Sequence, residues 1–297
     1  MKGRRNKEGR AMAKTIFRRK KQRKNRLIVA VIACILAVAL TVGIIAIALS
    51  NSDGTASSDG AQTAPTTTTT TRPTLPKAFI DNNTFSESIV LYDATNDQML
   101  YSKNADEKRA PASLTKMITA LVALDYTKPE DTITVGSEIN LIGYNSSTAN
   151  LSVGNKLTMK QLLQALLVKS GNDAAYVIAV HVGRIIAKDP KLDRYAAVSK
   201  FCEAMNKKAT DLGCSETTHF SNPDGYHADD HNTTANDMLK ASKALLDNTL
   251  LREIVGTPLV KAKLASGGTK TWKNSNYLLQ DGVPLICLGS LYTYASL

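Results

Sequence analysis

A serine and a lysine separated by two residues, Ser113 and Lys116, are the pair in this sequence best suited to nucleophilic chemistry. If a helix begins at Ser113, the two side chains lie one turn apart on the same face, with the amine within reach of the hydroxyl. A neutral lysine would then accept the serine proton and create a nucleophile. The alternative is structural, with Ser113 as a helix N-cap and Lys116 as a solvated helix residue.

A second polar cluster, Ser170-Gly171-Asn172, separates two segments that have helical apolar spacing. The segment before it opens with a capping box at residues 158–161, and the segment after it is apolar almost all round, as is typical of a central helix. A corner between two buried helices is a natural place for polar groups beside a cavity. Plain helix capping by Ser170 or Asn172 is the alternative interpretation.

Periodicity and turn residues predict the elements that position these clusters. Strands toward both ends of a helical block indicate an α/β domain of the layered α+β type. The expected elements are strands at 88–94, 98–102 and 132–135, helices at 113–126, 158–169, 172–186, 196–212 and 233–247, a turn-rich loop at 218–226, and a short helix followed by a strand within 251–264.

The net charge of +11 is concentrated at the N-terminus. Residues 1–26 contain 13 Lys or Arg and a single acid, so the rest of the chain has a net charge of −1. A body that is close to neutral has no basic stripe for nucleic acid, and we therefore expect no nucleic-acid partner. We predict that residues 1–26 form a basic cytoplasmic arm.

Residues 27–49 contain no charged side chain over 23 positions, which is long enough to span a bilayer. With the basic arm in the cytoplasm, this segment predicts a single-pass anchor in the cell membrane that places residues 50–297 outside. Residues 50–76, rich in Ser, Thr and Pro, are expected to form a disordered stalk, and residues 77–297 an extracellular domain. The alternative is a cleaved signal peptide, which would remove the tether without changing the compartment.

The cysteines match no spacing typical of a metal site. Cys34 lies in the predicted anchor, which leaves Cys202, Cys214 and Cys287 outside the membrane. Cys202 and Cys214 are candidates for a disulfide in an oxidising compartment, and two free thiols are the alternative.

Together these segments resemble the serine-type D-alanyl-D-alanine carboxypeptidases, which are low-molecular-weight penicillin-binding proteins related to class A β-lactamases. The resemblance covers about residues 86–286 and implies a penicillin-binding-protein-like fold, with an antiparallel sheet beside a helical block. Ala112–Ala120 is similar to the nucleophile segment, Ser170–Ala175 to the second motif, Phe220–Gly225 and His231–Ala235 to segments typical of the carboxypeptidases, and Asn274–Leu279 to the element before the third motif.

The resemblance also implies roles for individual residues. Ser113 would attack the penultimate D-alanine carbonyl of a peptidoglycan stem peptide, form an acyl-enzyme and release the terminal D-alanine, with β-lactam antibiotics as acylating inhibitors. Lys116 would accept the serine proton, Ser170 would relay a proton to the leaving amine, and Asn172 would bind the substrate amide. Backbone N–H groups at the helix start would stabilise negative charge, and no cofactor or metal is implied.

The third family motif, Lys-Thr-Gly, is missing from its expected place. Lys270-Thr271 is followed by Trp272 and precedes the Asn274–Leu279 element, so we interpret it as coincidental. The expected place falls near Cys287–Gly289, where only the glycine fits. Without a lysine to bind the substrate carboxylate, we expect weak or no carboxypeptidase turnover.

The family fold continues with further strands and a helix beyond Leu297, so we expect a C-terminally incomplete domain. Three explanations are a reading-frame error near Val283, a genuinely truncated and inactive relative, and another residue in place of the missing lysine. The competing functions are an inactive, membrane-anchored peptidoglycan-binding relative and a β-lactamase. The β-lactamase ranks lower because it would more typically carry Ser-Asp-Asn where this chain has Ser170–Asn172, and a Glu-x-x-Leu-Asn segment after it.

Overall fold

A computed structural model describes residues 84–276 and residue 279 of the 297-residue chain. The predicted arm, anchor and stalk, and the Cys287–Gly289 position, lie outside these residues. Within the described part of the chain, no helix is both long enough and apolar enough to cross a membrane.

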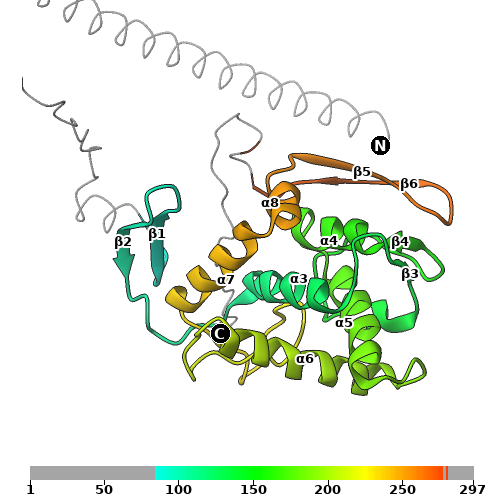
Figure 1. The fold of residues 1–297 in the computed structure, drawn as a ribbon, viewed down its shortest axis with the longest axis horizontal. Helices are drawn as coiled ribbons and strands as arrows, with labels where there is room; N and C mark the ends of the chain where they lie inside the picture. The colour runs from blue at the N-terminus through cyan, green and yellow to red at the C-terminus, as the bar shows by residue number, and fades with distance from the viewer. Residues whose placement is uncertain (1–83, 277–278, 280–297) are drawn as a thin grey trace, which may run out of the picture. The chain divides into compact units, whose positions relative to one another are not determined.

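The described domain is a block of helices with small antiparallel sheets around it (Figure 1). This arrangement confirms the predicted α/β class, although the strands between residues 84 and 276 form three separate two-stranded sheets. The elements in chain order are β1 (Ile89–Asp93), β2 (Gln98–Lys103), η1 (Ala112–Leu114), α3 (Thr115–Tyr126), β3 (Thr132–Thr134), η2 (Ser137–Leu141), β4 (Lys156–Thr158), α4 (Met159–Val168), α5 (Asn172–Ala187), α6 (Arg194–Asp211), α7 (Ala235–Asp247), α8 (Thr249–Val255), β5 (Leu259–Lys263) and β6 (Thr269–Lys273).

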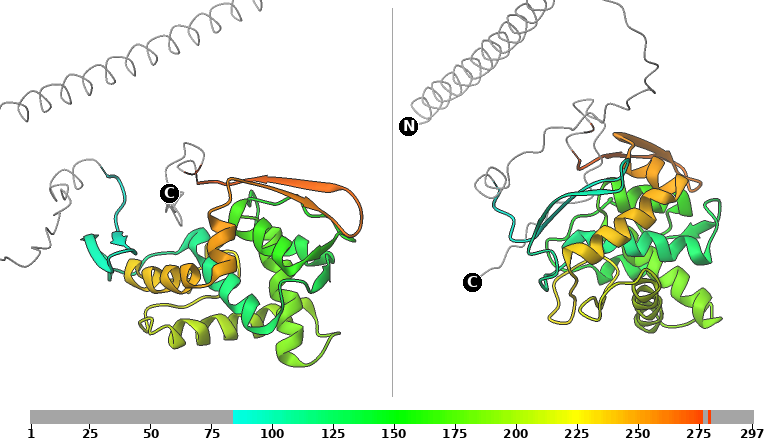
Figure 2. Two further views of the ribbon diagram at one scale, coloured as in Figure 1. Left: turned by 45° about the horizontal axis from the view of Figure 1, so that its top comes forward. Right: turned by 60° about the vertical axis from the view of Figure 1, so that its left-hand side comes forward.

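Helix α5 is the centre of the helical block and packs against α3, α4 and α6 (Figures 1 and 2). Most of its side chains are buried, as its all-round apolar pattern predicts. Gly183 allows α6 to cross closely, because a Cβ at this position would lie 1.9 Å from the carbonyl oxygen of Ala197. The site-bearing helices are therefore held by a close-packed core.

Local signals account for most helix ends. The predicted capping box at α4 is confirmed, with Thr158 accepting a hydrogen bond from the Gln161 N–H at 3.2 Å and the Gln161 side chain accepting one from the Thr158 N–H at 3.0 Å. Thr234, one of the two predicted starts of α7, caps it by accepting a hydrogen bond from the Asp237 N–H. The helix predicted at residue 113 begins as the 3₁₀ turn η1 and becomes α-helical at Thr115.

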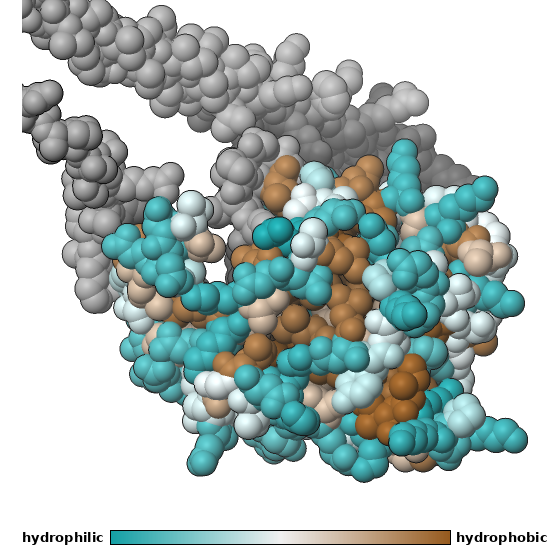
Figure 3. Space-filling model, in the orientation of Figure 1, coloured by the Kyte–Doolittle hydropathy of each residue, from teal (hydrophilic) through white to brown (hydrophobic). Residues whose placement is uncertain are grey.

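The three two-stranded sheets lie on the outside of the helical block (Figure 1). β1 contacts α7, and β5 contacts α4. β5 pairs with β6 from Leu259 opposite Lys273 to Lys263 opposite Thr269. The space-filling view shows hydrophilic side chains around the rim of one face and apolar surface toward its middle (Figure 3).

Candidate active site

The Ser113–Lys116 pair has the geometry that its spacing predicts. Lys116 Nζ donates a hydrogen bond to Ser113 Oγ at 3.0 Å, and the lysine is only 2% exposed. Neither η1 nor α3 has a side-chain N-cap hydrogen bond. The alternative of a capping serine and a solvated lysine is therefore wrong.

Burial changes the acid–base behaviour of Lys116. It lowers the pKa of the lysine from 10.5 to about 8, against the opposing effect of the Asp224 and Asp173 carboxylates. About a tenth of such a lysine is neutral at pH 7, compared with well under a thousandth for an unperturbed one. A neutral amine in hydrogen-bond contact with a serine hydroxyl is the arrangement needed to activate that serine as a nucleophile.

One face of α3 is fastened to the loop that the sequence predicted at residues 218–226. Lys116 Nζ donates to the Asp224 carbonyl oxygen at 2.7 Å, and Thr119 Oγ1 donates to the Pro223 carbonyl oxygen at 2.6 Å. Both contacts are buried and join residues more than 100 positions apart. Sequence reasoning missed Thr119 and Asp224 as site residues. A threonine three positions after Lys116, within an apolar helix, was the available signal.

The turn that presents Ser113 depends on a close approach by Gly225. Gly225 has a φ of +85°, and a Cβ there would lie 1.8 Å from the carbonyl oxygen of Ala112. Ala112 itself has a φ of +47°, which is uncommon for a residue with a side chain. The backbone immediately before the candidate nucleophile is thus held in a conformation that the neighbouring glycine accommodates.

His231 is a buried, neutral residue that contacts the start of α3. The Ser221 N–H donates to His231 Nδ1 at 3.0 Å, so the ring proton is on Nε2 and is donated to Thr115 Oγ1 at 2.7 Å. Burial lowers the pKa of His231 to about 4. The imidazole therefore orients Thr115 near neutral pH, and sequence reasoning assigned it no role of its own.

The second cluster forms the predicted corner between α4 and α5. Ser170 has a left-handed φ of +58°, and its hydroxyl makes no hydrogen bond with any residue that the structure describes. Gly171 is the N-cap of α5 and no side chain caps this helix, so the capping alternative is wrong. Asn172 is 7% exposed, and its N–H donates to the Ser147 carbonyl oxygen at 2.8 Å.

Asp173 braces this corner and was also missed. Its Oδ1 accepts a hydrogen bond from the Ala149 N–H at 2.8 Å, and its Oδ2 accepts one from the Leu151 N–H at 2.9 Å. From the other side, Trp272 Nε1 donates to the Ala149 carbonyl oxygen at 2.9 Å, and Lys270 Nζ donates to the Asn150 carbonyl oxygen. Because Asp173 raises the pKa of Lys116, the first turn of α5 lies within electrostatic reach of the lysine. The structure thus brings the two predicted clusters together through α3 and α5, which pack against each other.

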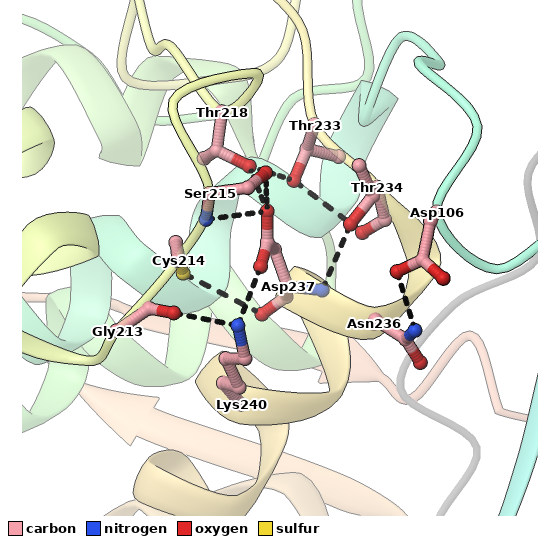
Figure 4. A network of polar contacts seen from close by, with 10 residues as sticks. All are labelled: Asp106, Gly213, Cys214, Ser215, Thr218, Thr233, Thr234, Asn236, Asp237 and Lys240. Atoms are coloured by element: carbon pink, nitrogen blue, oxygen red, sulfur yellow. Dashed lines mark hydrogen bonds and ion pairs between the residues drawn. The ribbon is translucent and has the colours of Figure 1, made fainter.

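A polar network at the start of α7 joins that helix to residues 213–218 and to Thr233 (Figure 4). The Asp237 carboxylate accepts hydrogen bonds from Ser215 Oγ at 2.6 Å, Thr218 Oγ1 at 2.7 Å and Lys240 Nζ at 2.9 Å. Burial alone would raise the pKa of Asp237, but these hydrogen bonds outweigh it and lower the pKa to about 2. This carboxylate therefore stays ionised and holds residues 215–218 against α7.

The described cysteines are both free thiols. Cys202 is buried and Cys214 half-buried, so the candidate disulfide between them is wrong and the alternative of two free thiols is confirmed. Burial raises the pKa of Cys202 to about 12 and that of Cys214 to about 11. In the part of the chain that the structure describes, no three His, Cys, Asp or Glu side chains are grouped to hold a metal ion.

Comparison with known proteins places this site in a family context. A family model described as D-alanyl-D-alanine carboxypeptidase matches residues 74–287. A D-alanyl-D-alanine carboxypeptidase of Streptomyces sp. (strain K15) is 34% identical over 191 residues, which cover 61% of this chain and 63% of the relative. The D-alanyl-D-alanine carboxypeptidase DacF of Bacillus subtilis is 31% identical over 175 residues, which cover 58% of this chain and 42% of the relative. The chain therefore spans about two fifths to three fifths of the length of these relatives.

Solved structures show the same likeness in three dimensions. The crystal structure of the Streptomyces K15 DD-transpeptidase is similar to this chain, with a TM-score of 0.58 and 33% sequence identity. The aligned part covers 65% of this chain and 74% of the transpeptidase chain. A D-alanyl-D-alanine carboxypeptidase from Mycobacterium tuberculosis H37Rv has a TM-score of 0.55 and 26% identity, and covers 65% of this chain and 68% of that chain.

Proposed function

The chain belongs to the D-alanyl-D-alanine carboxypeptidase family, and we propose that its Ser113 forms an acyl-enzyme with D-alanyl-D-alanine peptides of peptidoglycan and with β-lactams. One observation carries the proposal. The buried Lys116 amine lies 3.0 Å from the Ser113 hydroxyl, and burial lowers its pKa to about 8.

In the proposed reaction Ser113 transfers its proton to Lys116 and attacks the penultimate D-alanine carbonyl. The leaving amine takes a proton through Ser170, whose hydroxyl has no partner among the described residues, and the terminal D-alanine departs. Asn172, at the start of α5, binds the substrate amide. Water then releases the shortened peptide from Ser113.

We further propose that turnover by this chain is slow. No Lys-Thr-Gly follows Asn274–Leu279 in the printed sequence, so the cation that would bind the substrate carboxylate is missing. The same observation favours a second candidate, an inactive relative that binds peptidoglycan without cleaving it. A binder of that kind forms no acyl-enzyme, so the two candidates differ in a covalent product.

Labelling with a fluorescent penicillin separates them. We expect slow covalent labelling of the full chain, lost in Ser113→Ala and retained in Ser152→Ala, an exposed serine outside both clusters. No labelling of the wild type over hours at saturating penicillin would favour the binding relative. Labelling that survives Ser113→Ala would show that Ser113 is not the nucleophile. Fast labelling that matches an intact carboxypeptidase would show that the missing cation does not slow acylation and would contradict that part of the proposal.

We also propose that residues 27–49 anchor the chain in the cell membrane, with residues 1–26 in the cytoplasm and the domain outside. The charge-free run and its basic flank support this orientation. Protease added to intact cells should degrade the domain and leave the N-terminal arm protected. Release of the domain by alkaline carbonate would contradict an integral anchor.

A further inference from the structure

Asp224 carries a buried carboxyl group that the proposed reaction does not use. The residue is 1% exposed, and its Oδ1 accepts a hydrogen bond from the Tyr226 N–H at 3.2 Å. Its Oδ2 is buried and has no hydrogen-bond partner among the residues that the structure describes. A buried, half-satisfied carboxyl group is costly and calls for a physical explanation.

The explanation lies in the residue that Asp224 contacts. Its carbonyl oxygen accepts a hydrogen bond from Lys116 Nζ at 2.7 Å, while the same amine donates to Ser113 Oγ at 3.0 Å. The main chain of Asp224 therefore aims the amine at the serine. The side chain brings a negative charge into the same buried space, where opposite charges interact strongly.

The other ionisable groups near Asp224 do not compensate its charge. Tyr176 of α5 and Cys202 of α6 both have a raised pKa, chiefly through burial and also through Asp224, so both are neutral near pH 7. The Asp173 carboxylate of α5 accepts hydrogen bonds from the N–H groups of Ala149 and Leu151. Burial raises the pKa of Asp224, and Lys116 is the single cation among the described residues that opposes this rise.

We propose that Asp224 is a positioning residue for Lys116. The carbonyl group of Asp224 orients the lysine amine, and its buried carboxylate stabilises the ammonium that forms when Lys116 takes the serine proton. The second half rests on the proposed function. In that step the Ser113 O–H bond breaks and an Nζ–H bond forms. The serine oxygen keeps the electron pair with which it attacks the carbonyl carbon, and Lys116 later passes the proton on toward the leaving amine.

The test is a pH titration of the Lys116 side chain by NMR in the full chain, using the ¹³Cε and ¹⁵Nζ signals assigned by their loss in Lys116→Arg. We expect a midpoint near pH 8 in the wild type. In Asp224→Asn, which keeps the main-chain contact and removes the charge, the midpoint should fall below the wild-type value by more than the fitting error. The matched control is Asp229→Asn, at an exposed position of the neighbouring loop, which should leave the midpoint unchanged.

A midpoint that stays in place or rises in Asp224→Asn would overturn the proposal. Should Asp224→Asn fail to fold by circular dichroism, Asp224→Ser offers a smaller side chain with the same main-chain carbonyl, and the same downward shift is expected. The titration needs no substrate. A downward shift together with absent penicillin labelling would therefore support the Lys116–Asp224 pairing and contradict only the proposed function.

Where labelling occurs, its rate against pH provides a second readout. In Asp224→Asn the acid limb of the profile should move to lower pH and the plateau rate should fall, because the lysine is a weaker base. A fall in rate at every pH with an unmoved acid limb would show a purely structural role and contradict the proposal.

Discussion

The two polar corners of the site are held in different ways. At the Ser113 corner, buried polar groups of α3 have partners from a distant loop, including His231 for Thr115 and the Asp224 carbonyl for Lys116. At the Ser170 corner the backbone is braced through Asp173, while the Ser170 hydroxyl has no partner among the described residues. The first corner is therefore held by hydrogen bonds from α3 to a distant loop, and the second by a carboxylate at the start of α5.

The corners also share a feature. Ala112 and Ser170 are both non-glycine residues with left-handed backbones, at φ values of +47° and +58°. Such conformations cost of order 1–3 kcal/mol and persist only where the surroundings impose them. At Ala112 the neighbouring Gly225 is part of those surroundings, whereas Ser170 lies at the helix–helix corner itself.

The largest effect should come from breaking the contact beneath the first corner. Gly225→Ala places a Cβ against the Ala112 carbonyl at a φ of +85°, so we expect a loss of about 3 kcal/mol or more in unfolding free energy, and loss of penicillin labelling. Gly154→Ala is the control, since its φ is +87° with nothing within 4 Å, and it should cost about 1 kcal/mol from backbone strain alone. Equal losses in urea denaturation would refute the importance of the close approach.

Replacing Lys116 should have two separate effects, one on the acylation rate and one on the pH dependence of the unfolding free energy. Lys116→Met should lower the acylation rate about 10²- to 10⁴-fold, because the proposed proton acceptor is lost. The wild type, with a folded-state pKa near 8 and an unfolded-state value of 10.5, should gain about 3 kcal/mol as the pH rises through this window. Lys116→Met should lack that gain. The control Lys128→Met, at an exposed position, should retain it. Denaturant melts at pH 7.5 and 10 test this, and a gain that persists in Lys116→Met would contradict the assigned pKa.

His231 should make the first corner sensitive to acid. Its folded-state pKa near 4 lies below the unfolded value of 6.5, so the unfolded chain binds a proton first and about 3 kcal/mol of stability is lost as the pH falls from 6.5 to 4. His231→Gln, which retains a donor for Thr115, should remove this component of the acid loss. His227→Gln, at an exposed histidine, is the control. Identical acid profiles for the wild type and His231→Gln would argue against a buried neutral imidazole.

The smallest effect should come from relieving strain at the second corner. Ser170→Gly permits the left-handed backbone at lower cost, and we expect about 1 kcal/mol of added stability together with impaired acylation. Ser152→Gly, at an exposed position without a left-handed φ, should give no such gain. A loss of stability in Ser170→Gly would mean that the serine side chain makes a stabilising contact of its own.

Local chemistry made much of the fold predictable. The β1–β2 hairpin, the capping box of α4, the corner at residues 169–172 and the Thr234 cap follow from turn residues, caps and periodicity within short windows. The sequence did not predict η2, β4 or β6 as elements. These are short elements with no strong period of their own. β4 pairs with β3, from which η2 and its loops separate it in the chain, whereas β6 pairs with the neighbouring β5 across a short turn.

For the site, the spacing of Ser113 and Lys116 within a helical turn was enough to predict an amine in contact with a hydroxyl. It could not reveal that Lys116 is 2% exposed, that Asp224 lies beside it, or that His231 holds Thr115. Those facts depend on a loop 108 residues further along the chain. The desolvation that lowers the pKa of Lys116 exists only once that loop has packed against α3. The sequence therefore determined which groups meet across one helical turn, and the tertiary structure alone decided the dielectric and charge that surround them.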